Sequence, residues 1–239
     1  MTSQTDTPVI NRYDWTEIET DLNTRGWALL PGLLTPETCR EIAGLYSSDD
    51  TSFRSRVIMQ RHGFGRGEYQ YFSYPLPELI SEMRASFYEK LAPIANRWAE
   101  RMDHDWTYPA RHDDFIRTCH DAGQRRPTPL LLQYGPGDYN CLHQDLYGAK
   151  AFPLQMAVLL SRPGKDFEGG SLVLTEQRPR MQSRPHVIPL TQGDAVIFAV
   201  NERPVRGTRG DYRVKLRHGV SEVWRGERHV AGLIFHDAG

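Results

Sequence analysis

The sequence predicts a β-rich core that is supported by a mostly helical N-terminal half. Up to about residue 120, apolar residues recur at the three- and four-residue steps of amphipathic helices. From about residue 129, short apolar runs alternate with Gly and Pro, as in proteins built from short antiparallel strands. No helix-length pattern separates these runs, which argues against a parallel sheet of alternating strands and helices. A double-stranded β-helix, or jelly roll, fits best.

The N-terminal half contains recognisable helix starts and one long apolar stripe. Residues 1–12 form an expected loose tail, and Asp14 and Thr35 are suitable N-caps, with Pro36 in a first helical turn. The stripe predicts one long helix with a bend near Pro93. Its members are Leu79, Ile80, Met83, Phe87, Leu91, Ile94 and Trp98.

The C-terminal half contains seven candidate strands. They are Pro129–Tyr134, Pro153–Leu160, Ser171–Thr175, His186–Leu190, Asp194–Val200, Arg213–Val223 and Arg228–Phe235. Gly and Pro lie between them, as expected for turns. We therefore expect a helical support and lid region over residues 1–128 and a double-stranded β-helix core over residues 129–239, joined in one compact unit.

Length and composition indicate an ordinary soluble domain. The chain has 239 residues, of which 39% are hydrophobic and 25% charged, and its formal net charge is −1. It contains no run of eighteen apolar residues and no apolar stretch of the signal-peptide kind, so we expect a cytoplasmic protein without a membrane partner. Its three cysteines lack CxxC spacing, which argues against a disulfide framework or a zinc knuckle.

The string His143-Gln144-Asp145 is a candidate metal-binding motif. In a strand, residues i and i+2 point to the same face, so the imidazole and the carboxylate can share one ion. His218, in a candidate strand far downstream, can provide the third ligand. Two histidines and one carboxylate on one side of a metal leave open positions, the arrangement of non-haem Fe(II) oxygenases. A surface turn that contains His143 and Asp145 is the alternative reading.

The residues after His218 strengthen this interpretation. Arg228 lies ten residues beyond it, and the set His143, Asp145, His218 and Arg228 resembles the motif of the Fe(II)- and 2-oxoglutarate-dependent oxygenases. The resemblance implies that Arg228 binds the C5 carboxylate of 2-oxoglutarate. It also implies the cofactors Fe(II), 2-oxoglutarate and O₂, and a dioxygenase that hydroxylates a substrate C–H bond with release of succinate and CO₂. The segments GGSLVLTE and HVIPLTQGDAVIFAV resemble the prolyl-hydroxylase-like branch.

A second resemblance concerns the substrate. The stretch LLLQYGPGDYNCLHQD resembles the oxidative demethylases that repair N-alkylated nucleic-acid bases, and it implies that Tyr134 touches 2-oxoglutarate. The overall sequence is similar to a bacterial branch of oxygenases that act on damaged nucleic acid. Tyr139, Asn140 and Gln155 are further candidates for the lining of the cosubstrate pocket, and Tyr147, which follows HQDL, is a candidate to close over the iron.

The segment from Arg54 to Phe72 interleaves arginines with aromatic residues. Such a segment can hold a single strand, with phosphates on the arginines and bases on the aromatic rings. We therefore take Arg61, Arg66, Tyr69 and Tyr71 as candidate contacts to alkylated single-stranded nucleic acid. A glycine-hinged lid over the mouth of the barrel is the alternative reading of residues 60–72.

Two other functions fit the same motifs. The prolyl-hydroxylase-like strands favour a hydroxylase of a protein side chain or of a small amino-acid-like metabolite, whose carboxylate an arginine would bind. A jelly roll that binds 2-oxoglutarate or a metal without turnover is the other alternative. Oxygen-dependent turnover distinguishes an enzyme from such a sensor.

Overall fold

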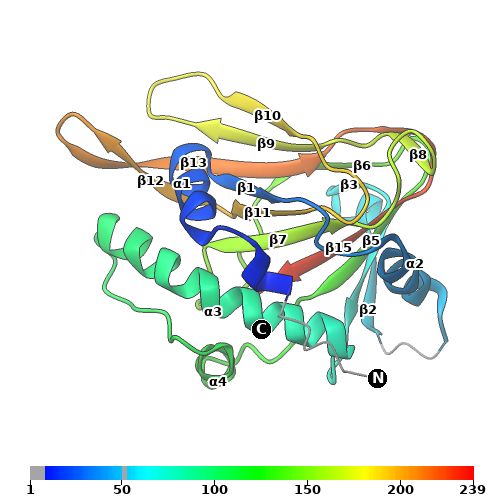
Figure 1. Ribbon diagram of the computed structural model, residues 1–239, viewed down its shortest axis with the longest axis horizontal. Helices are drawn as coiled ribbons and strands as arrows, with labels where there is room; N and C mark the ends of the chain where they lie inside the picture. Colours follow the sequence, from blue (N-terminus) through cyan, green and yellow to red (C-terminus); the bar gives the residue numbers. More distant parts are fainter. Residues whose placement is uncertain (1–8, 50–52) are drawn as a thin grey trace.

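The computed structural model describes residues 9–49 and 53–239, and two antiparallel sheets form its core (Figure 1). The larger sheet has the strand order β1-β11-β7-β15-β5-β4-β2. Its strands are β1 Trp27–Leu30, β2 Phe53–Ile58, β4 Glu68–Phe72, β5 Leu130–Tyr134, β7 Leu154–Leu159, β11 Ala195–Ala199 and β15 Arg228–Ile234. Buried apolar side chains from both sheets belong to one hydrophobic core, as the predicted double-stranded β-helix requires.

The smaller sheet has the order β10-β9-β13-β6-β3, with β12 paired to β13. Its strands are β3 Gly65–Arg66, β6 Tyr139–His143, β9 Leu172–Gln177, β10 Arg184–Ile188, β12 Glu202–Gly207 and β13 Gly210–Val220. Strands β8 Phe167–Gly169 and β14 Val223–Gly226 pair with each other in a separate two-stranded sheet. Along β13, buried and exposed residues alternate from Arg213 to His218, so one face of this strand turns inward.

Four α-helices accompany the sheets: α1 Trp15–Arg25, α2 Pro36–Gly44, α3 Glu78–Arg101 and α4 His112–Asp121. Short 3₁₀ helices span Val9–Arg12, Leu45–Ser47 and Met59–His62. The expected caps are confirmed, because the Asp14 carboxylate accepts from the amides of Thr16 and Glu17, and Thr35 accepts from Thr38. Helix α3 runs through Pro93 and lies along the outer side of the larger sheet (Figure 1).

The apolar stripe of α3 is buried, with Leu79 only partly so, which explains why the helix forms on the sheet. All seven candidate strands of the C-terminal half coincide with observed strands, within a few residues at each end. Strands β6, β8 and β12 lie outside these seven ranges, and β14 overlaps them only at Val223. Most residues of β6 are exposed, so this strand lacks the apolar alternation that predicts a half-buried strand. None of the helices in the described ranges is long and apolar enough to span a membrane.

The N-terminal half contributes strands as well as helices, which differs from the expected division at residue 128. Strand β1 pairs with β11 at one edge of the larger sheet, whereas β4 pairs with β5 near the other edge. Strand β3 pairs with β6 in the smaller sheet. Residues 65–72 are therefore part of both sheets rather than a separate lid. The alternation of Tyr69 and Tyr71 with polar residues is the strand signal that the lid interpretation overlooked.

Candidate metal centre and cosubstrate pocket

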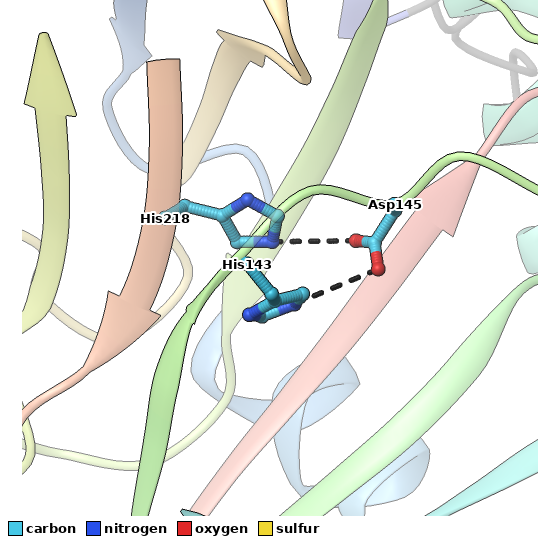
Figure 2. A group of neighbouring side chains, drawn as sticks. All are labelled: His143, Asp145 and His218. Atoms are coloured by element: carbon cyan, nitrogen blue, oxygen red, sulfur yellow. Dashed lines mark ion pairs between the residues drawn. The ribbon is translucent and has the colours of Figure 1, made fainter. Parts of the chain in front are cut away.

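The side chains of His143, Asp145 and His218 meet between the two sheets (Figure 2). His143 is the last residue of β6, and it is the cross-strand partner of His218 on β13. One ligand atom from each residue lies within 4.8 Å of the other two. The Nε2 atom of His143 is 3.5 Å from Asp145 Oδ1, and that of His218 is 3.3 Å from Oδ2. The three residues that the motif singled out therefore lie together, although Asp145 follows the strand rather than belonging to it.

The hydrogen bonds of His143 leave one ring nitrogen available to a metal. Its Nδ1 atom lies 2.7 Å from the carbonyl oxygen of Cys141, so Nδ1 carries the proton and donates it. The Nε2 atom then keeps its lone pair and faces Asp145. Metal-bound histidines are commonly fixed in this way by a hydrogen bond from the second nitrogen.

The charges of the cluster suit a cation. Burial alone would raise the pKa of Asp145, but the hydrogen bonds that His218 and Tyr147 make with its carboxylate, together with the neighbouring His143, hold this pKa far below its usual range. Burial and the neighbouring His218 lower the pKa of His143. The site therefore presents an ionised carboxylate and a neutral imidazole, the protonation states in which these groups bind metals.

Tyr147 makes direct contact with the carboxylate of Asp145. Its hydroxyl donates to Asp145 Oδ1 over 2.7 Å, and it lies 3.2 Å from the hydroxyl of Tyr71. Burial, and then the charge of Asp145, raise the pKa of Tyr147 far above its usual value, so the phenol stays protonated. The sequence indicated Tyr147 as a candidate to close over the iron but gave no sign of this contact.

A cavity of about 380 Å³ opens beside the three residues, a size typical of small-molecule sites. Most of its lining is apolar or aromatic, and among the described lining residues Asp145 and Arg228 are the only acidic or basic ones apart from the two histidines. Of the further candidates, Asn140, Gln155 and Tyr147 line the cavity, whereas Tyr139 does not.

Arg228 is buried in the cavity wall without an anionic partner. Its side chain is 3% exposed, its Nε atom has no hydrogen-bond partner, and no carboxylate within the described ranges forms an ion pair with it. Burial lowers the pKa of Arg228 to about 10. Because an uncompensated buried charge is strongly unfavourable, this position fits an anionic ligand such as the carboxylate of 2-oxoglutarate.

Tyr134 lies beside Arg228, as its cross-strand partner on β5. The guanidinium carbon of Arg228 is 5.5 Å from the centre of the Tyr134 ring, and the amide of Asn140 donates to the Tyr134 hydroxyl over 3.4 Å. The Tyr134 side chain is fully buried, and this burial raises its pKa to about 12. A protonated phenol beside Arg228 provides a second polar contact for a carboxylate.

The four candidate substrate contacts fall into two pairs. Tyr69 and Tyr71 of β4 line the cavity, where their rings meet edge to face. Arg61 and Arg66 are exposed and lie outside the cavity lining, and Arg66 is 3.9 Å from Asp138. Phe64, which the same segment contributes, lines the cavity and is nevertheless 47% exposed. The segment thus forms part of the wall and part of the rim.

Comparisons with known proteins agree with this geometry. Residues 67–238 match the model of the Oxygenase-NA family, described as oxygenases catalysing oxidative methylation of damaged DNA. Two uncharacterized proteins from two strains of Mycobacterium tuberculosis are each 46% identical over 167 residues, which cover 70% of this chain and 72% of the relative.

Solved structures share the fold at low sequence identity. A prolyl-4-hydroxylase from Pseudomonas putida is 14% identical with a TM-score of 0.55, and covers 95% of this chain and 100% of its own. A prolyl hydroxylase from Trichoplax adhaerens, solved with a peptide fragment, is 15% identical with a TM-score of 0.57, and covers 97% and 92%. A 2-oxoglutarate-Fe(II) oxygenase family member from Burkholderia pseudomallei is 13% identical with a TM-score of 0.51, and covers 96% and 94%.

The family match covers well over half of the chain, and it includes all three candidate metal ligands and Arg228. The donor set of two imidazoles and one carboxylate fits Fe(II), and the buried, unpaired Arg228 fits 2-oxoglutarate. The chain has the double-stranded β-helix fold, and its site contains the residue types that bind Fe(II) and 2-oxoglutarate in the enzymes that depend on both. Because the family match covers most of its length, the chain belongs to the Oxygenase-NA family of oxygenases.

Proposed function

We propose that the chain is an Fe(II)- and 2-oxoglutarate-dependent dioxygenase that removes alkyl groups from nucleic-acid bases. One observation carries the dioxygenase part. The cluster of His143, Asp145 and His218 opens into the same cavity as Arg228, a buried cation without an anionic partner in the described ranges. A site built for a metal alone would not need that cation.

Each residue has a defined part in this proposal. His143, Asp145 and His218 would hold Fe(II), while Arg228 and the Tyr134 hydroxyl would bind the distal carboxylate of 2-oxoglutarate. Together, the cofactors supply the oxidation of a substrate C–H bond to C–OH, with conversion of 2-oxoglutarate and O₂ to succinate and CO₂. The apolar lining keeps water away from the reacting groups.

The balance of the reaction explains how hydroxylation removes a methyl group from nitrogen. Hydroxylation of an N–CH₃ group gives N–CH₂OH. This product breaks at the N–C bond, the hydroxyl proton passes to the nitrogen, and formaldehyde leaves. The unmodified base is restored without a further cofactor, so formaldehyde and succinate should appear in equal amounts.

The cavity wall supports a flat substrate group. Tyr69, Tyr71 and Tyr147, here called the tyrosine wall, line it together with leucines and an isoleucine. The Tyr71 end of the wall lies away from Arg228, because Tyr71 pairs with Leu130, four residues along β5 from the Tyr134–Arg228 pair, or about 13 Å. A substrate group can therefore use the wall while 2-oxoglutarate occupies Arg228. Flipped bases are held by flat side chains of this kind.

A free amino-acid-like substrate fits this lining less well. Its ammonium and carboxylate groups would each need a partner, and Arg228 and Asp145 are already assigned to the cofactors. At the rim, the rings of His62 and Phe64 stack with centroids 5.3 Å apart, close in sequence to exposed Arg61 and Arg66. Aromatic rings beside arginines favour an unpaired strand.

The test measures succinate and formaldehyde from the Fe(II)-loaded protein, with 2-oxoglutarate and an N-methylated single-stranded oligonucleotide. An unmethylated oligonucleotide of the same sequence is the matched control. We expect the methylated strand alone to stimulate succinate formation, with one formaldehyde per succinate. Succinate formation that neither oligonucleotide changes would reject nucleic acid and favour a protein or metabolite hydroxylase. Binding of 2-oxoglutarate without any oxygen-dependent turnover would favour a sensor.

A further inference from the structure

We propose that Tyr147 is a positioning residue of the metal centre: its hydroxyl aligns the carboxylate of Asp145, on a loop that Gln124 holds in place. The inference rests on the proposed metal site, but it is independent of the substrate. It assigns a role to two residues outside the ligand set, and to a contact that the family motif does not contain.

Asp145 needs such a contact because no strand fixes it. Strand β6 ends at His143, and residues 144–147 have no regular secondary structure. The carboxylate is nevertheless buried, with Oδ2 on the side of His218 and Oδ1 on the side of His143. Tyr147 donates to Oδ1 over 2.7 Å, which sets the rotation of the carboxylate about its own axis.

The loop that carries both residues is clamped by the side chain of Gln124, which is 2% exposed. Its Oε1 atom accepts from the amide of Lys150 over 2.7 Å, and its Nε2 atom donates to the carbonyl oxygens of Tyr147 at 2.9 Å and Lys150 at 3.1 Å. The same Nε2 atom lies 2.6 Å from the carbonyl oxygen of Asp237. The loop is thereby fixed to the C-terminal end of the chain.

Gly148 makes this close approach possible. A Cβ atom at this position would lie 2.5 Å from Gln124 Cδ, and its φ of +90° is unfavourable for other residues. The glycine therefore lets the clamp reach the backbone of the loop directly. A larger residue here would displace the clamp, and Tyr147 with it.

A second tyrosine supports the first. The Tyr71 hydroxyl donates to the Tyr147 hydroxyl over 3.2 Å, so Tyr147 both accepts and donates. Tyr71 is itself held by Arg54, whose guanidinium carbon lies 4.2 Å from the ring centre and whose Nε atom donates to the Pro127 carbonyl. A continuous chain of contacts thus leads from Arg54 on β2 to the carboxylate of Asp145.

The decisive measurement is the Fe(II) dissociation constant of the apo-protein, titrated without oxygen, 2-oxoglutarate or nucleic acid. In Tyr147→Phe, we expect this constant to rise roughly 10- to 100-fold, the usual effect of losing a hydrogen bond to a metal ligand. Tyr88→Phe is the matched control, because it also removes a buried tyrosine hydroxyl, one that donates to the Pro109 carbonyl over 2.8 Å and lies outside the cavity lining. Its Fe(II) dissociation constant should equal that of the wild type.

An unchanged Fe(II) constant in folded Tyr147→Phe would overturn the positioning role, even if the Michaelis constant for a substrate rose. Circular dichroism establishes whether the variant is folded. If it is not, Tyr71→Phe decides instead, with an expected rise of about 2- to 10-fold from the loss of one neutral hydrogen bond. No change in that variant would also reject the inference. Absence of Fe(II) binding by the wild type would reject the metal site itself, whereas inert oligonucleotides would reject only the proposed substrate.

Discussion

Two polar clusters in this molecule each combine a buried arginine and a buried aspartate with histidine, but they differ in how their charges are paired. The junction cluster links α3 and α4 to the C-terminal end of the chain, and consists of Arg84, His120, Asp237 and Tyr74. The cavity cluster lies between the sheets, and consists of His143, Asp145, His218 and Arg228.

In the junction cluster every charged group has a partner. Arg84 Nη2 lies 2.8 Å from Asp237 Oδ1, and its Nε atom donates to the carbonyl of Ile234. The other oxygen of Asp237 lies 2.8 Å from His120 Nε2 and accepts from the Tyr74 hydroxyl at 2.9 Å. A buried cluster that is complete within the chain has a structural role, because no donor or charge is left for a ligand.

In the cavity cluster, one guanidinium nitrogen and one imidazole nitrogen are left unpaired among the described residues. Arg228 Nε and His218 Nδ1 have no hydrogen-bond partner, and no described carboxylate pairs with Arg228. The two arginines are similarly buried, since Arg84 is 1% and Arg228 3% exposed. What distinguishes the candidate binding site from the junction cluster is therefore that its buried charged and polar groups lack partners, and not how buried they are or which residue types they belong to.

The largest effect should come from removing a residue of the proposed ligand set. Asp145→Ala or His143→Ala should reduce succinate formation to the level of the metal-free protein, because two ligands hold Fe(II) poorly. His120→Ala removes a histidine from the junction cluster instead, and turnover should persist. The assay is Fe(II)-dependent succinate release, with circular dichroism for folding. Full activity of Asp145→Ala would reject the ligand assignment.

The junction cluster should respond in stability rather than in activity. Arg84→Met leaves the buried carboxylate of Asp237 without its cation, and breaking a buried pair in this way costs about 3–5 kcal/mol. Urea denaturation should show this loss of unfolding free energy. The Michaelis constant for 2-oxoglutarate should stay near the wild-type value in the protein that remains folded. A stable variant with weakened 2-oxoglutarate binding would contradict the distinction between the clusters.

Acid should weaken the region around the junction cluster. Burial, and then the charge of Arg84, lower the pKa of buried His112 and of buried His236 to about 4 each. In the unfolded chain both would titrate near 6.5, so between pH 6.5 and pH 4 the unfolded state binds more protons. The unfolding free energy should therefore fall over this interval, by about 3 kcal/mol for each histidine.

His112→Gln separates this contribution from the rest. Glutamine can still donate to the Phe235 carbonyl that His112 contacts at 2.9 Å, but it does not titrate. The unfolding free energy of the variant, measured by urea denaturation at pH 7 and pH 4.5, should decline less than that of the wild type. Equal declines would mean that His112 is not buried in its neutral form.

The two clusters also differ in how far the sequence predicts them. The HxD string, His218 and Arg228 stand in a linear pattern with known spacing, so all four residues of the cavity cluster could be named in advance. The junction cluster could not, because Arg84 and Asp237 are 153 residues apart and neither lies in a motif. Contacts between residues that are far apart in the chain produce no periodic pattern from which a single sequence could predict them.

Contacts around the candidate metal centre and short strands were likewise not predictable from the sequence. Gln124 lies in the loop after α4 and holds the loop of Tyr147, 23 residues further along the chain, and the residues next to Gln124 in the sequence do not indicate this contact. Strands β1 and β3 are four and two residues long, too short for a pattern of alternation. The jelly-roll core was predictable because its longer strands are apolar and separated by Gly and Pro.

Arg228→Met should affect binding rather than stability, the reverse of Arg84→Met. The variant loses a charged contact to the 2-oxoglutarate carboxylate worth about 1.5–3 kcal/mol, which corresponds to a Michaelis constant roughly 10- to 100-fold higher. Its unfolding free energy without ligand should not fall, since a buried charge that lacks a partner is removed. A destabilised variant with an unchanged Michaelis constant would show that Arg228 has a structural role, like Arg84, and does not bind the cosubstrate.

The smallest effect should come from Tyr134→Phe. The substitution keeps the ring, whose centre lies 5.5 Å from the guanidinium carbon of Arg228, and removes only the hydroxyl. If that hydroxyl donates to the cosubstrate, its loss should raise the Michaelis constant for 2-oxoglutarate about 2- to 10-fold, the range for one neutral donor. In the double variant with Arg228→Met, the two effects should be less than additive, because both groups would bind the same carboxylate. Strict additivity would instead place Tyr134 in the wall of the cavity, with Arg228 as the sole anchor.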